Sequence, residues 1–494
     1  MANRWQLEQA RPDFNWNQFH RYSGLDSANT LEICLAQIPL LKQRRVESTF
    51  QSEMSLCYPL ISIELKGMLI DSKVRTKIFT ELQAQIDKWQ LFLTTLCGDL
   101  NVQSPDQLKH YFYTQLRLPK RTKDGKLSTD EDAMLSLMHL QPVLIKAILI
   151  LKALKKQQTF TKSKLAEDGR ARTTFKPAGT LTGRLSSSKS ITGTGTNLQT
   201  IPKAIREFFI CDPGYILIQV DYAKAESWIV AYLAKDEKMI EALQGPDFHS
   251  TNASAILGKP VTKADYDDRQ LGKKISHGCN YNMTEFQMQL DLAKEGYSFT
   301  KTECKGFKDH YFVVYPKIKK NFHGEVEECL KTTRTLITPF GRKITFWDFW
   351  STRLLNQAYA YRPQSTVGDL TNTALINVYN DIPELDLLLQ VHDSLVMQCK
   401  IEDYTPELIE KIEKAMAVPV TVKGVTITIP IDLEVGWNWY KLVEPPVMDK
   451  VLQRMDHSKL STLSTEDYLD YRKEVFAEVM SEIKKAKELK TSVV

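Results

Sequence analysis

Apolar residues recur at helical spacing in the first third of the chain and again near its end. This spacing predicts helices over residues 30–49, 71–98 and 130–158, and an amphipathic terminal helix over 464–488. A basic loop separates the second of these helices from the third. We therefore expect two antiparallel helices with a charged tip, a shape suited to gripping a rod-like partner.

Short apolar runs in the second half of the chain predict strands. Residues 215–220 form one such run, and a helical stretch follows over 225–234. The segment LDLLLQVHDSLVMQCK predicts two strands that meet in a hairpin turn at His392–Asp393. VTITIPIDLEV (425–435) predicts a further strand, and Pro445–Pro446 marks the expected end of the compact part.

Length and composition narrow the class of protein. A chain of 494 residues is too long for one simple domain, and its 43% hydrophobic and 25% charged residues exclude a largely disordered chain. No apolar run is long enough to span a membrane, and the first residues do not resemble a signal peptide. The eight cysteines include no CxxC pair, which argues against a disulfide or zinc framework. We expect a cytoplasmic protein with no membrane contact.

Charge is nearly balanced overall but unevenly distributed. The chain has 65 basic and 60 acidic residues, whereas residues 101–176 alone contain 15 basic residues against 7 acidic ones. Such an excess can bind a polyanion through phosphate contacts. A solvated helix face would have the same composition, and charge alone leaves the two interpretations equal.

Two aspartates stand at the ends of apolar strands. Asp221 closes the strand over 215–220, and Asp393 lies at the hairpin turn. An aspartate among apolar residues is costly to bury unless it is ionised and paired, and a divalent metal ion is a common partner. Two carboxylates on adjacent strands can bridge two such ions and support phosphoryl transfer. Two unrelated strand-end aspartates would leave the same pattern.

A stripe of cations and rings lies further along the chain. Arg269, Lys273, His277 and Tyr281 are spaced four residues apart, so one helix would carry them on one slowly rotating face. Two cations followed by two rings suit a triphosphate and a stacked base. His249 could donate a further hydrogen bond to phosphate. A basic stripe of this kind is also common on solvated helices.

Six segments in order resemble the motifs of the polymerase domain of family A DNA polymerases, the bacterial DNA polymerase I group and its phage relatives. VDYAKAES resembles motif A, RQLGKKISHGCNYNM motif B and QVHDSLV motif C. Three further segments resemble regions of the family that contact primer-template DNA or the nucleotide: TGRLSSS with NLQTIP, DFHS, and PQST. The resemblance extends from about Leu60 to Val443. It implies an α+β right-hand fold, in which an antiparallel sheet forms the palm and helices form the fingers and the thumb.

The resemblance also implies an order of domains. We expect residues 1–50 to be a remnant of, or linker from, an exonuclease-like domain, 51–175 the palm entry and thumb, 176–245 the palm with motif A, 246–345 the fingers with motif B, 346–444 the palm with motif C, and 445–494 a C-terminal helical extension.

The implied reaction is template-directed addition of deoxynucleotides to a primer 3′ end, with two Mg²⁺ ions that Mn²⁺ can replace. Lys273 would also act as the acid toward pyrophosphate. The implied partners are primer-template DNA and deoxynucleoside triphosphates. The implied site residues are Asp221, the carbonyl of Tyr222 and Asp393 for the metals; Glu226, His249, Arg269, Lys273, His277 and Tyr281 for the nucleotide; and Arg184, Asn197, Gln199, Gln364 and His392 for DNA.

Two other functions fit part of this pattern. A single-subunit RNA polymerase would share the two aspartates and the lysine and tyrosine of motif B. Glu226, at the position of a steric gate against ribose, favours deoxynucleotides. A non-catalytic DNA-binding paralogue should lack a metal aspartate or the cations of motif B, and this chain has both.

The chain departs from the family pattern at several positions. Ser394 replaces the usual glutamate after Asp393, so a third carboxylate role is in doubt. His277 replaces the usual aromatic residue of motif B, and sugar selection at this position cannot be carried over. Residues 189–196 are additional to the usual link between two motifs. These departures indicate a divergent member of the family, and we expect a viral source, with the host cytoplasm as its location.

Near the start of the chain, Tyr22 and Asp26 have the YxxxD spacing of the last motif of the family's proofreading exonuclease. A single aspartate cannot hold two metal ions, so we expect extension without excision of a mismatched 3′ end. A separate exonuclease or processivity protein could dock near residues 1–50. The terminal helix either docks a partner or packs on the palm.

Overall fold

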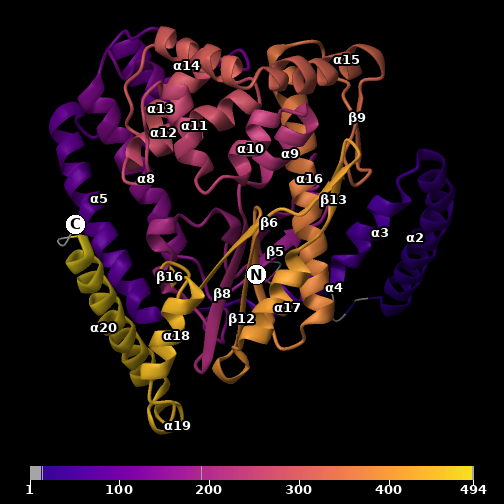
Figure 1. Cartoon of the computed structure of the whole chain (residues 1–494), viewed down its shortest axis with the longest axis vertical. Helices are drawn as coiled ribbons and strands as arrows, with labels where there is room; N and C mark the ends of the chain where they lie inside the picture. The colour runs from indigo at the N-terminus through magenta and orange to yellow at the C-terminus, as the bar shows by residue number, and fades with distance from the viewer. Residues whose placement is uncertain (1–12, 14, 191, 492–494) are drawn as a thin grey trace.

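A five-stranded antiparallel sheet forms the centre of the computed structural model, which describes residues 13, 15–190 and 192–491 (Figure 1). The strand order is β11-β12-β8-β15-β16. The predicted strand over 215–220 and the predicted hairpin are both confirmed. The bounds are β8 (Tyr215–Tyr222), β11 (Asp386–Val391), β12 (Ser394–Lys400), β15 (Ile431–Gly436) and β16 (Leu442–Val443).

The predicted single strand over 425–435 is wrong. Its first part is β14 (Val425–Ile427), which pairs with β13 (Val420–Val422) outside the central sheet. Pro430 separates β14 from β15, since proline has no N–H to donate to a strand ladder. The carbonyl of Pro430 accepts a hydrogen bond from the backbone N–H of Ala223 at 2.8 Å, which places the start of β15 beside the end of β8.

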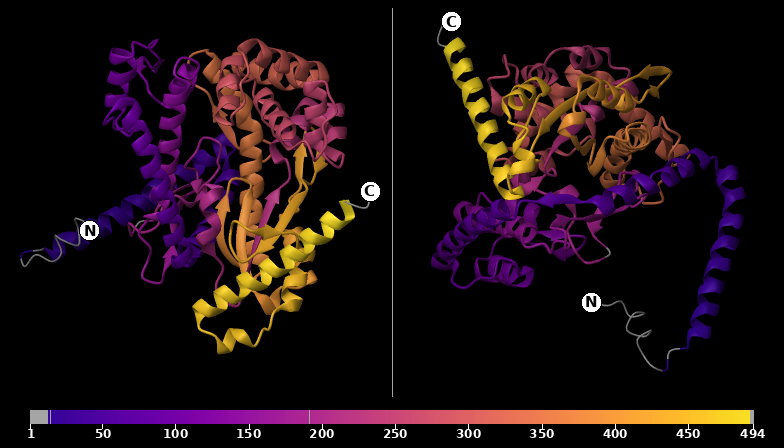
Figure 2. Two further views of the ribbon diagram at one scale, coloured as in Figure 1. Left: turned by 90° about the vertical axis from the view of Figure 1, so that its left-hand side faces the viewer. Right: turned by 90° about the horizontal axis from the view of Figure 1, so that it is seen from below.

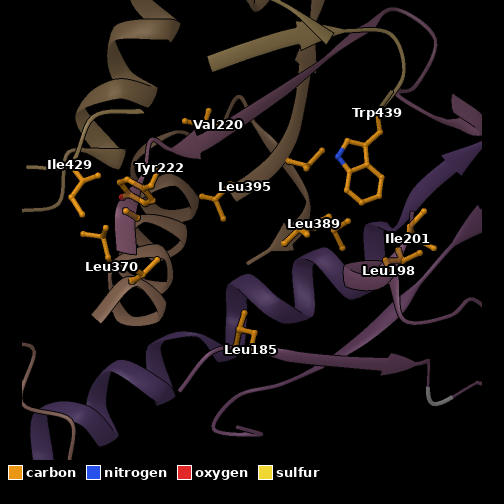
Figure 3. Packing of buried hydrophobic residues seen from close by; sticks show 14 of the residues in the cluster. Leu185, Leu198, Ile201, Val220, Tyr222, Leu370, Leu389, Leu395, Ile429 and Trp439 are labelled. Carbon is orange, nitrogen blue, oxygen red and sulfur yellow. The ribbon is translucent and has the colours of Figure 1, made fainter. Parts of the chain in front are cut away.

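Helices pack against the sheet and bury its apolar side chains. The helix α16 (Thr352–Asp381) packs against β12 and against α9 (Ala225–Ala234), which confirms the helix predicted over 225–234. Figure 3 shows Leu370 of α16 close to Tyr222 of β8, and both side chains are buried. Because β8 and β12 lie inside this packed core, the residues at their ends have fixed positions.

Two long helices form an arm on one side of the sheet, as the sequence predicts. They are α5 (Ser72–Cys97) and α8 (Pro142–Thr161), which lie side by side in Figure 1. Gln158 donates to Gln83 at 2.7 Å. Lys155, nearly one turn earlier on α8, donates to Gln90 further along α5, so the two helices are antiparallel.

The helix predicted over 130–158 is two helices, α7 (Glu131–Leu137) and α8. Pro142 is the first residue of α8, and the residue before a proline is driven out of helical conformation. Gln141 accordingly has φ −139° and ψ 64°. The arm therefore has a bent tip, where α7 packs on a second group of helices.

That second group lies above the sheet in Figure 1 and consists of α10 to α15. Within it, α11 (Phe248–Leu257) and α12 (Tyr266–Asn280) pack closely. A Cβ at Gly272 would lie 2.5 Å from the Cβ of Ala253, so the approach of the two helices requires glycine there. The remaining members are α10 (Glu237–Gln244), α13 (Glu285–Lys294), α14 (Lys301–Val314) and α15 (Gly324–Thr332).

The helix predicted over 30–49 is divided at Arg45, which has a left-handed φ of 54°. The two helices are α2 (Trp16–Arg44) and α3 (Glu47–Ser55). The helix α2 has no buried residue, and Figure 2 shows it standing away from the rest of the chain. Tyr22 and Asp26 both lie on it. Among the described residues, no helix is both long enough and apolar enough to cross a membrane.

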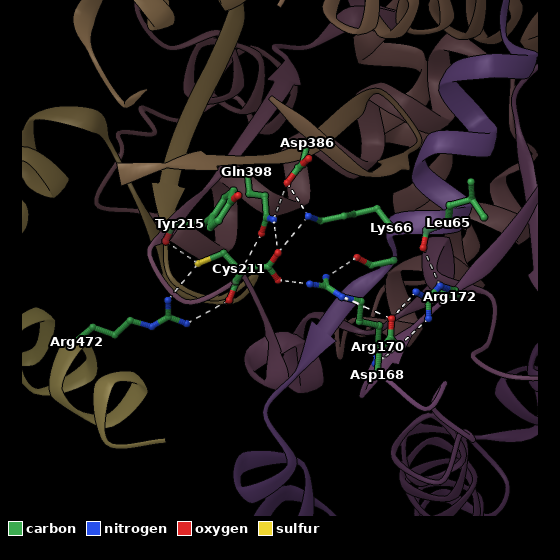
Figure 4. A network of polar contacts seen from close by, with 12 residues as sticks. Leu65, Lys66, Asp168, Arg170, Arg172, Cys211, Tyr215, Asp386, Gln398 and Arg472 are labelled. Carbon is green, nitrogen blue, oxygen red and sulfur yellow. Dashed lines mark hydrogen bonds and ion pairs between the residues drawn. The ribbon is translucent and has the colours of Figure 1, made fainter. Parts of the chain in front are cut away.

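The chain does not leave the compact part at Pro445. This residue begins α18 (Pro445–Arg454), and the predicted terminal helix is α20 (Thr465–Thr491). Arg472 of α20 is only 1% exposed and donates to the sulfur of Cys211 at 3.3 Å, as Figure 4 shows. Lys473 forms an ion pair of 2.7 Å with Asp71, which caps α5. The terminal helix thus packs on the body of the protein through Cys211 and Asp71.

Candidate active site

The two predicted metal aspartates lie side by side at one edge of the sheet. Asp221 in β8 is paired in register with Ser394, the first residue of β12, so Asp393 lies directly beside it. The backbone N–H of Tyr222 donates to the carbonyl of Asp393 at 3.3 Å. Asp221 and Asp393 both line a cavity of about 600 Å³ between the sheet and the α11–α13 helices.

Burial raises the pKa of both carboxyl groups. For Asp221, loss of solvation is the largest cause, followed by the charges of Asp393 and Asp432, and together they raise its pKa to about 7. Burial also raises the pKa of Asp393. Both groups are therefore harder to ionise than ordinary aspartates, and a cation between them would relieve the repulsion.

A third carboxylate lies opposite the pair and was not predicted. Asp432 of β15 is in register with Asp221 across the sheet. Its charge contributes to the raised pKa of Asp221. The predicted strand over 425–435 includes Asp432, but only the sheet order shows that this segment lies next to β8.

Ser394 does not offer a substitute for the missing glutamate. Its hydroxyl donates to the carbonyl of Val391 at 2.9 Å, and the residue is buried. The local carboxylate pair is thus Asp221 and Asp393. No group of three or more His, Cys, Asp or Glu side chains among the described residues is arranged to hold a metal ion. A metal bound here would need further ligands from the bound nucleotide, from water or from main-chain carbonyls such as that of Tyr222.

The predicted stripe of motif B lies on α12, as expected. Lys273 and His277 line the cavity, and the charge of Lys273 opposes the rise in the pKa of Asp221. Arg269, one turn earlier, pairs with Asp247 at 3.2 Å. Asp247 was not predicted, although its position at the start of DFHS marks the N-cap of α11.

His249 lies among the cations of this cavity. Loss of solvation is the largest cause of its lowered pKa, followed by the charges of Lys273, Arg269 and Lys224, and the pKa falls to about 4. The ring is therefore neutral near pH 7. Its buried Nδ1 has no hydrogen-bond partner among the described residues. A bound anion would both provide an acceptor and balance the surrounding positive charge.

Glu226 is held by three neighbours in the cavity wall. Arg184 donates to its Oε1 at 2.6 Å, and the hydroxyl of Tyr281 donates to its Oε2. The ring of His277 lies 3.8 Å from the same Oε2 and packs edge-on against Tyr281. The structure thus brings three of the predicted nucleotide and DNA residues together around the carboxylate of a fourth, Glu226. Burial and the adjacent negative charge raise the pKa of Tyr281 well above its ordinary value.

The other predicted DNA residues do not line the cavity that contains the aspartate pair. Gln199 is buried and donates to the side chain of Gln390 at 2.9 Å, and Gln390 donates in turn to the carbonyl of His392. Gln390 links the NLQTIP segment to the hairpin and was not predicted. Asn197 caps the short helix that contains Gln199, so its amide oxygen is already occupied.

His392 is exposed at the hairpin turn, where its φ is 56°. Gln364 is half-buried on α16. Of the five predicted DNA residues, His392 therefore has the most accessible side chain, and Gln199 would have to leave Gln390 before it could contact DNA.

A family model described as DNA polymerase family A matches residues 72–441, three quarters of the chain. The chain belongs to DNA polymerase family A. Family A polymerases need divalent metal ions, and the buried carboxylate pair fits such a requirement. The right-hand polymerase fold implied by the sequence is also confirmed.

Bacterial DNA polymerases I are among the curated relatives of this family A chain. It is 28% identical over 416 residues to DNA polymerase I of Caldicellulosiruptor bescii, which covers 79% of this chain and 47% of the relative. It is 30% identical over 403 residues to DNA polymerase I of Helicobacter pylori, which covers 77% and 43%. The chain thus spans about half the length of the curated relatives that it matches.

A solved structure has the same fold. The polymerase domain of Pol1 from M. smegmatis, in complex with DNA primer-template and dNTP, superposes with a TM-score of 0.73 at 25% sequence identity. The match covers 83% of this chain and 74% of the other. The domain boundaries and the viral source inferred from the sequence stay predictions.

Proposed function

We propose that this chain is a DNA-directed DNA polymerase, which adds deoxynucleotides to a primer 3′ end and releases pyrophosphate. The observation that carries the proposal is the cavity itself. Two carboxylates with raised pKa values and a cluster of cations line the same cavity of about 600 Å³. The chain that contains this cavity belongs to DNA polymerase family A. The related structure in complex with primer-template and dNTP supports the same substrates.

Asp221, Asp393 and the carbonyl of Tyr222 would hold two Mg²⁺ ions. Carboxylate and carbonyl oxygens are the ligands that Mg²⁺ prefers, and substrate phosphates commonly complete its coordination. Such a pair of ions supplies activation of the primer hydroxyl and neutralisation of the leaving pyrophosphate. The side chains of Asp221 and Asp393 share one sheet edge, so the protein would set the separation of the ions through the β8–β12 register.

Lys273, Arg269 and His249 would bind the triphosphate. Lys273 lines the cavity beside Asp221, and a lysine there can both neutralise phosphate charge and give a proton to pyrophosphate. Arg269 is preoriented by its ion pair with Asp247. His249 is neutral near pH 7, so it would act as a hydrogen-bond donor rather than as a cation.

Glu226 would exclude ribonucleotides. Its hydrogen bonds to Arg184 and Tyr281 prevent it from swinging aside, so a ribose 2′-hydroxyl at this position would meet a fixed carboxylate. Arg184 is then committed to Glu226, and its part in DNA binding would be indirect. Asn197, Gln199, Gln364 and His392 would contact the minor groove near the primer end, where acceptor positions are nearly independent of sequence.

The test is extension of a labelled primer on a template by the purified chain. The proposal predicts Mg²⁺-dependent growth of the primer with dNTPs, much weaker growth with rNTPs, and none with EDTA. Mn²⁺ should restore part of the activity. A mismatched primer run in parallel tests for proofreading. DNA binding without extension under any metal condition would overturn the proposal and favour a non-catalytic paralogue.

A further inference from the structure

Three large aromatic side chains are exposed within four consecutive residues. Trp347 is 86% exposed, Phe349 95% and Trp350 49%. At roughly 200 Å² for a full aromatic side chain, they present several hundred Å² of ring surface to solvent. This is as large as the biggest apolar patch of an ordinary monomer, and such patches usually mark binding sites. We call residues 347–350 the aromatic loop.

The aromatic loop is held in place at both ends. It follows β10 (Lys343–Thr345), and Arg334 donates to the carbonyl of Phe346 at 2.7 Å and to the carbonyl of Asp348. After the loop, Ser351 caps α16 by accepting from the N–H of Leu354 at 3.2 Å. The backbone is therefore fixed while the rings stay in solvent, so little conformational freedom would be given up on binding.

A strongly basic hairpin lies beside this loop. It consists of residues 117–127 and includes β2 (Thr122–Lys123) and β3 (Lys126–Leu127) at the tip of the helical arm. This stretch contains five Lys or Arg residues and a single acid, Asp124. Asp124 lies 3.8 Å from Arg353, in the first turn of α16 just after the aromatic loop. The structure thus brings the basic hairpin next to the residue that lies three positions after the aromatic loop, although the two segments are more than two hundred residues apart in the sequence.

Exposed rings next to exposed cations suit single-stranded nucleic acid. The bases of a single strand are free to stack on aromatic side chains, whereas those of a duplex already stack on each other. Lysine is depleted in protein–protein interfaces but is common beside phosphates. The combination therefore favours a single strand over a protein partner.

We propose that the aromatic loop is a stacking platform for single-stranded DNA and that the basic hairpin holds the phosphates of the same strand. The platform does not overlap the active site, because none of its residues lines the catalytic cavity. In a polymerase the strand could be the unpaired template ahead of the primer or a displaced strand. The inference extends the proposed function but is tested by binding, so either one can fail alone.

The direct test is fluorescence anisotropy with a labelled oligothymidylate at several salt concentrations. The double variant Trp347→Ala/Phe349→Ala should bind at least about tenfold more weakly, since each base–aromatic stack is worth roughly 5- to 100-fold in affinity. Trp347→Phe should retain most of the binding. Tyr58→Ala, which removes a 73% exposed aromatic residue on α4 (Cys57–Lys66), is the matched control and should bind as the wild type does.

The basic hairpin has its own readout. Lys120→Ala/Lys126→Ala should lower the slope of log affinity against log salt by about 0.7 for each phosphate that a lysine no longer neutralises. Lys88→Ala on α5 removes an exposed charge elsewhere on the arm and should leave the slope unchanged. Equal thermal unfolding curves would show that all variants fold.

Three DNA substrates identify the strand that is bound. The double aromatic variant should bind a blunt duplex normally and show weaker affinity either for a duplex with a 5′ template overhang or for one with a 5′ flap. Wild-type affinity of this variant for oligothymidylate and for both single-stranded extensions would overturn the proposal. A loop-dependent dimer in sedimentation, with DNA binding unchanged, would also overturn it and assign the rings to self-association.

Discussion

The substitution Asp221→Asn should remove activity and yet stabilise the metal-free protein at alkaline pH. The carboxyl group lies beside Asp393 and opposite Asp432, and burial and these charges raise its pKa to about 7. In the unfolded chain the same group ionises near 3.8, its ordinary value. Between these two pH values the folded protein binds a proton that the unfolded chain has released, so stability falls as pH rises.

The size of the effect follows from the same numbers. A pKa raised from 3.8 to about 7 lowers the free energy of unfolding above pH 7 by about 4 kcal/mol, at about 1.4 kcal/mol per tenfold change in the ionisation constant. This is an upper limit, because the repulsion is shared with Asp393. Because Asp221→Asn removes this penalty, the variant should melt roughly a few degrees higher than the wild type in a chain of this length.

Thermal unfolding in EDTA at pH 5 and pH 8 measures this. The variant should melt higher than the wild type at pH 8 and by a clearly smaller margin at pH 5, where Asp221 is protonated in the folded protein but already ionised in the unfolded chain. Mg²⁺ should raise the melting temperature of the wild type only. Asp381→Asn, at the exposed end of α16, is the matched control and should shift melting much less. A variant less stable than the wild type at pH 8 without metal would refute the repulsion argument.

Three further predictions concern other residues. Glu226→Ala should raise rNTP incorporation tenfold or more relative to dNTP incorporation, measured as the ratio of kcat/KM; an unchanged ratio would contradict the gate. Lys273→Met should lower the single-turnover extension rate by roughly 10²- to 10⁴-fold, the range of general acid catalysis, with DNA affinity retained. Arg472→Met should lower the free energy of unfolding by about 1–3 kcal/mol, because it removes the buried guanidinium that bonds Cys211, and should leave extension measurable. Denaturant titration measures the last effect.

Local patterns predicted where the two aspartates and the motif B side chains lie. Asp221 and Asp393 each end an apolar run, and the four-residue spacing from Arg269 to Tyr281 places the motif B side chains on one helix. These signals are contained within short segments, so the sequence reveals them without knowledge of the fold. The start of β8 and, to within one residue, the boundaries of α5 and α9 were predicted for the same reason.

The missed residues depend on contacts between distant segments. Asp432 matters because β15 pairs with β8, and Gln390 matters because it lies between Gln199 and His392. Neither pairing has a local signal. The breaks at Pro142 and Pro430 did have a local signal. A proline disfavours helical conformation in the residue before it, and it has no N–H to donate to a neighbouring strand. In both cases the apolar spacing around the proline concealed the break.

The central claim is tested most directly by single-turnover primer extension with the variant Asp393→Ala. The control is Ser394→Ala, at the next position in the sequence. Both variants should bind primer-template with wild-type affinity. Asp393→Ala should show no measurable extension in Mg²⁺, because one of the two metal-binding carboxylates is gone, whereas Ser394→Ala should stay within a few-fold of the wild type. Wild-type turnover by Asp393→Ala would contradict the assignment of the catalytic centre.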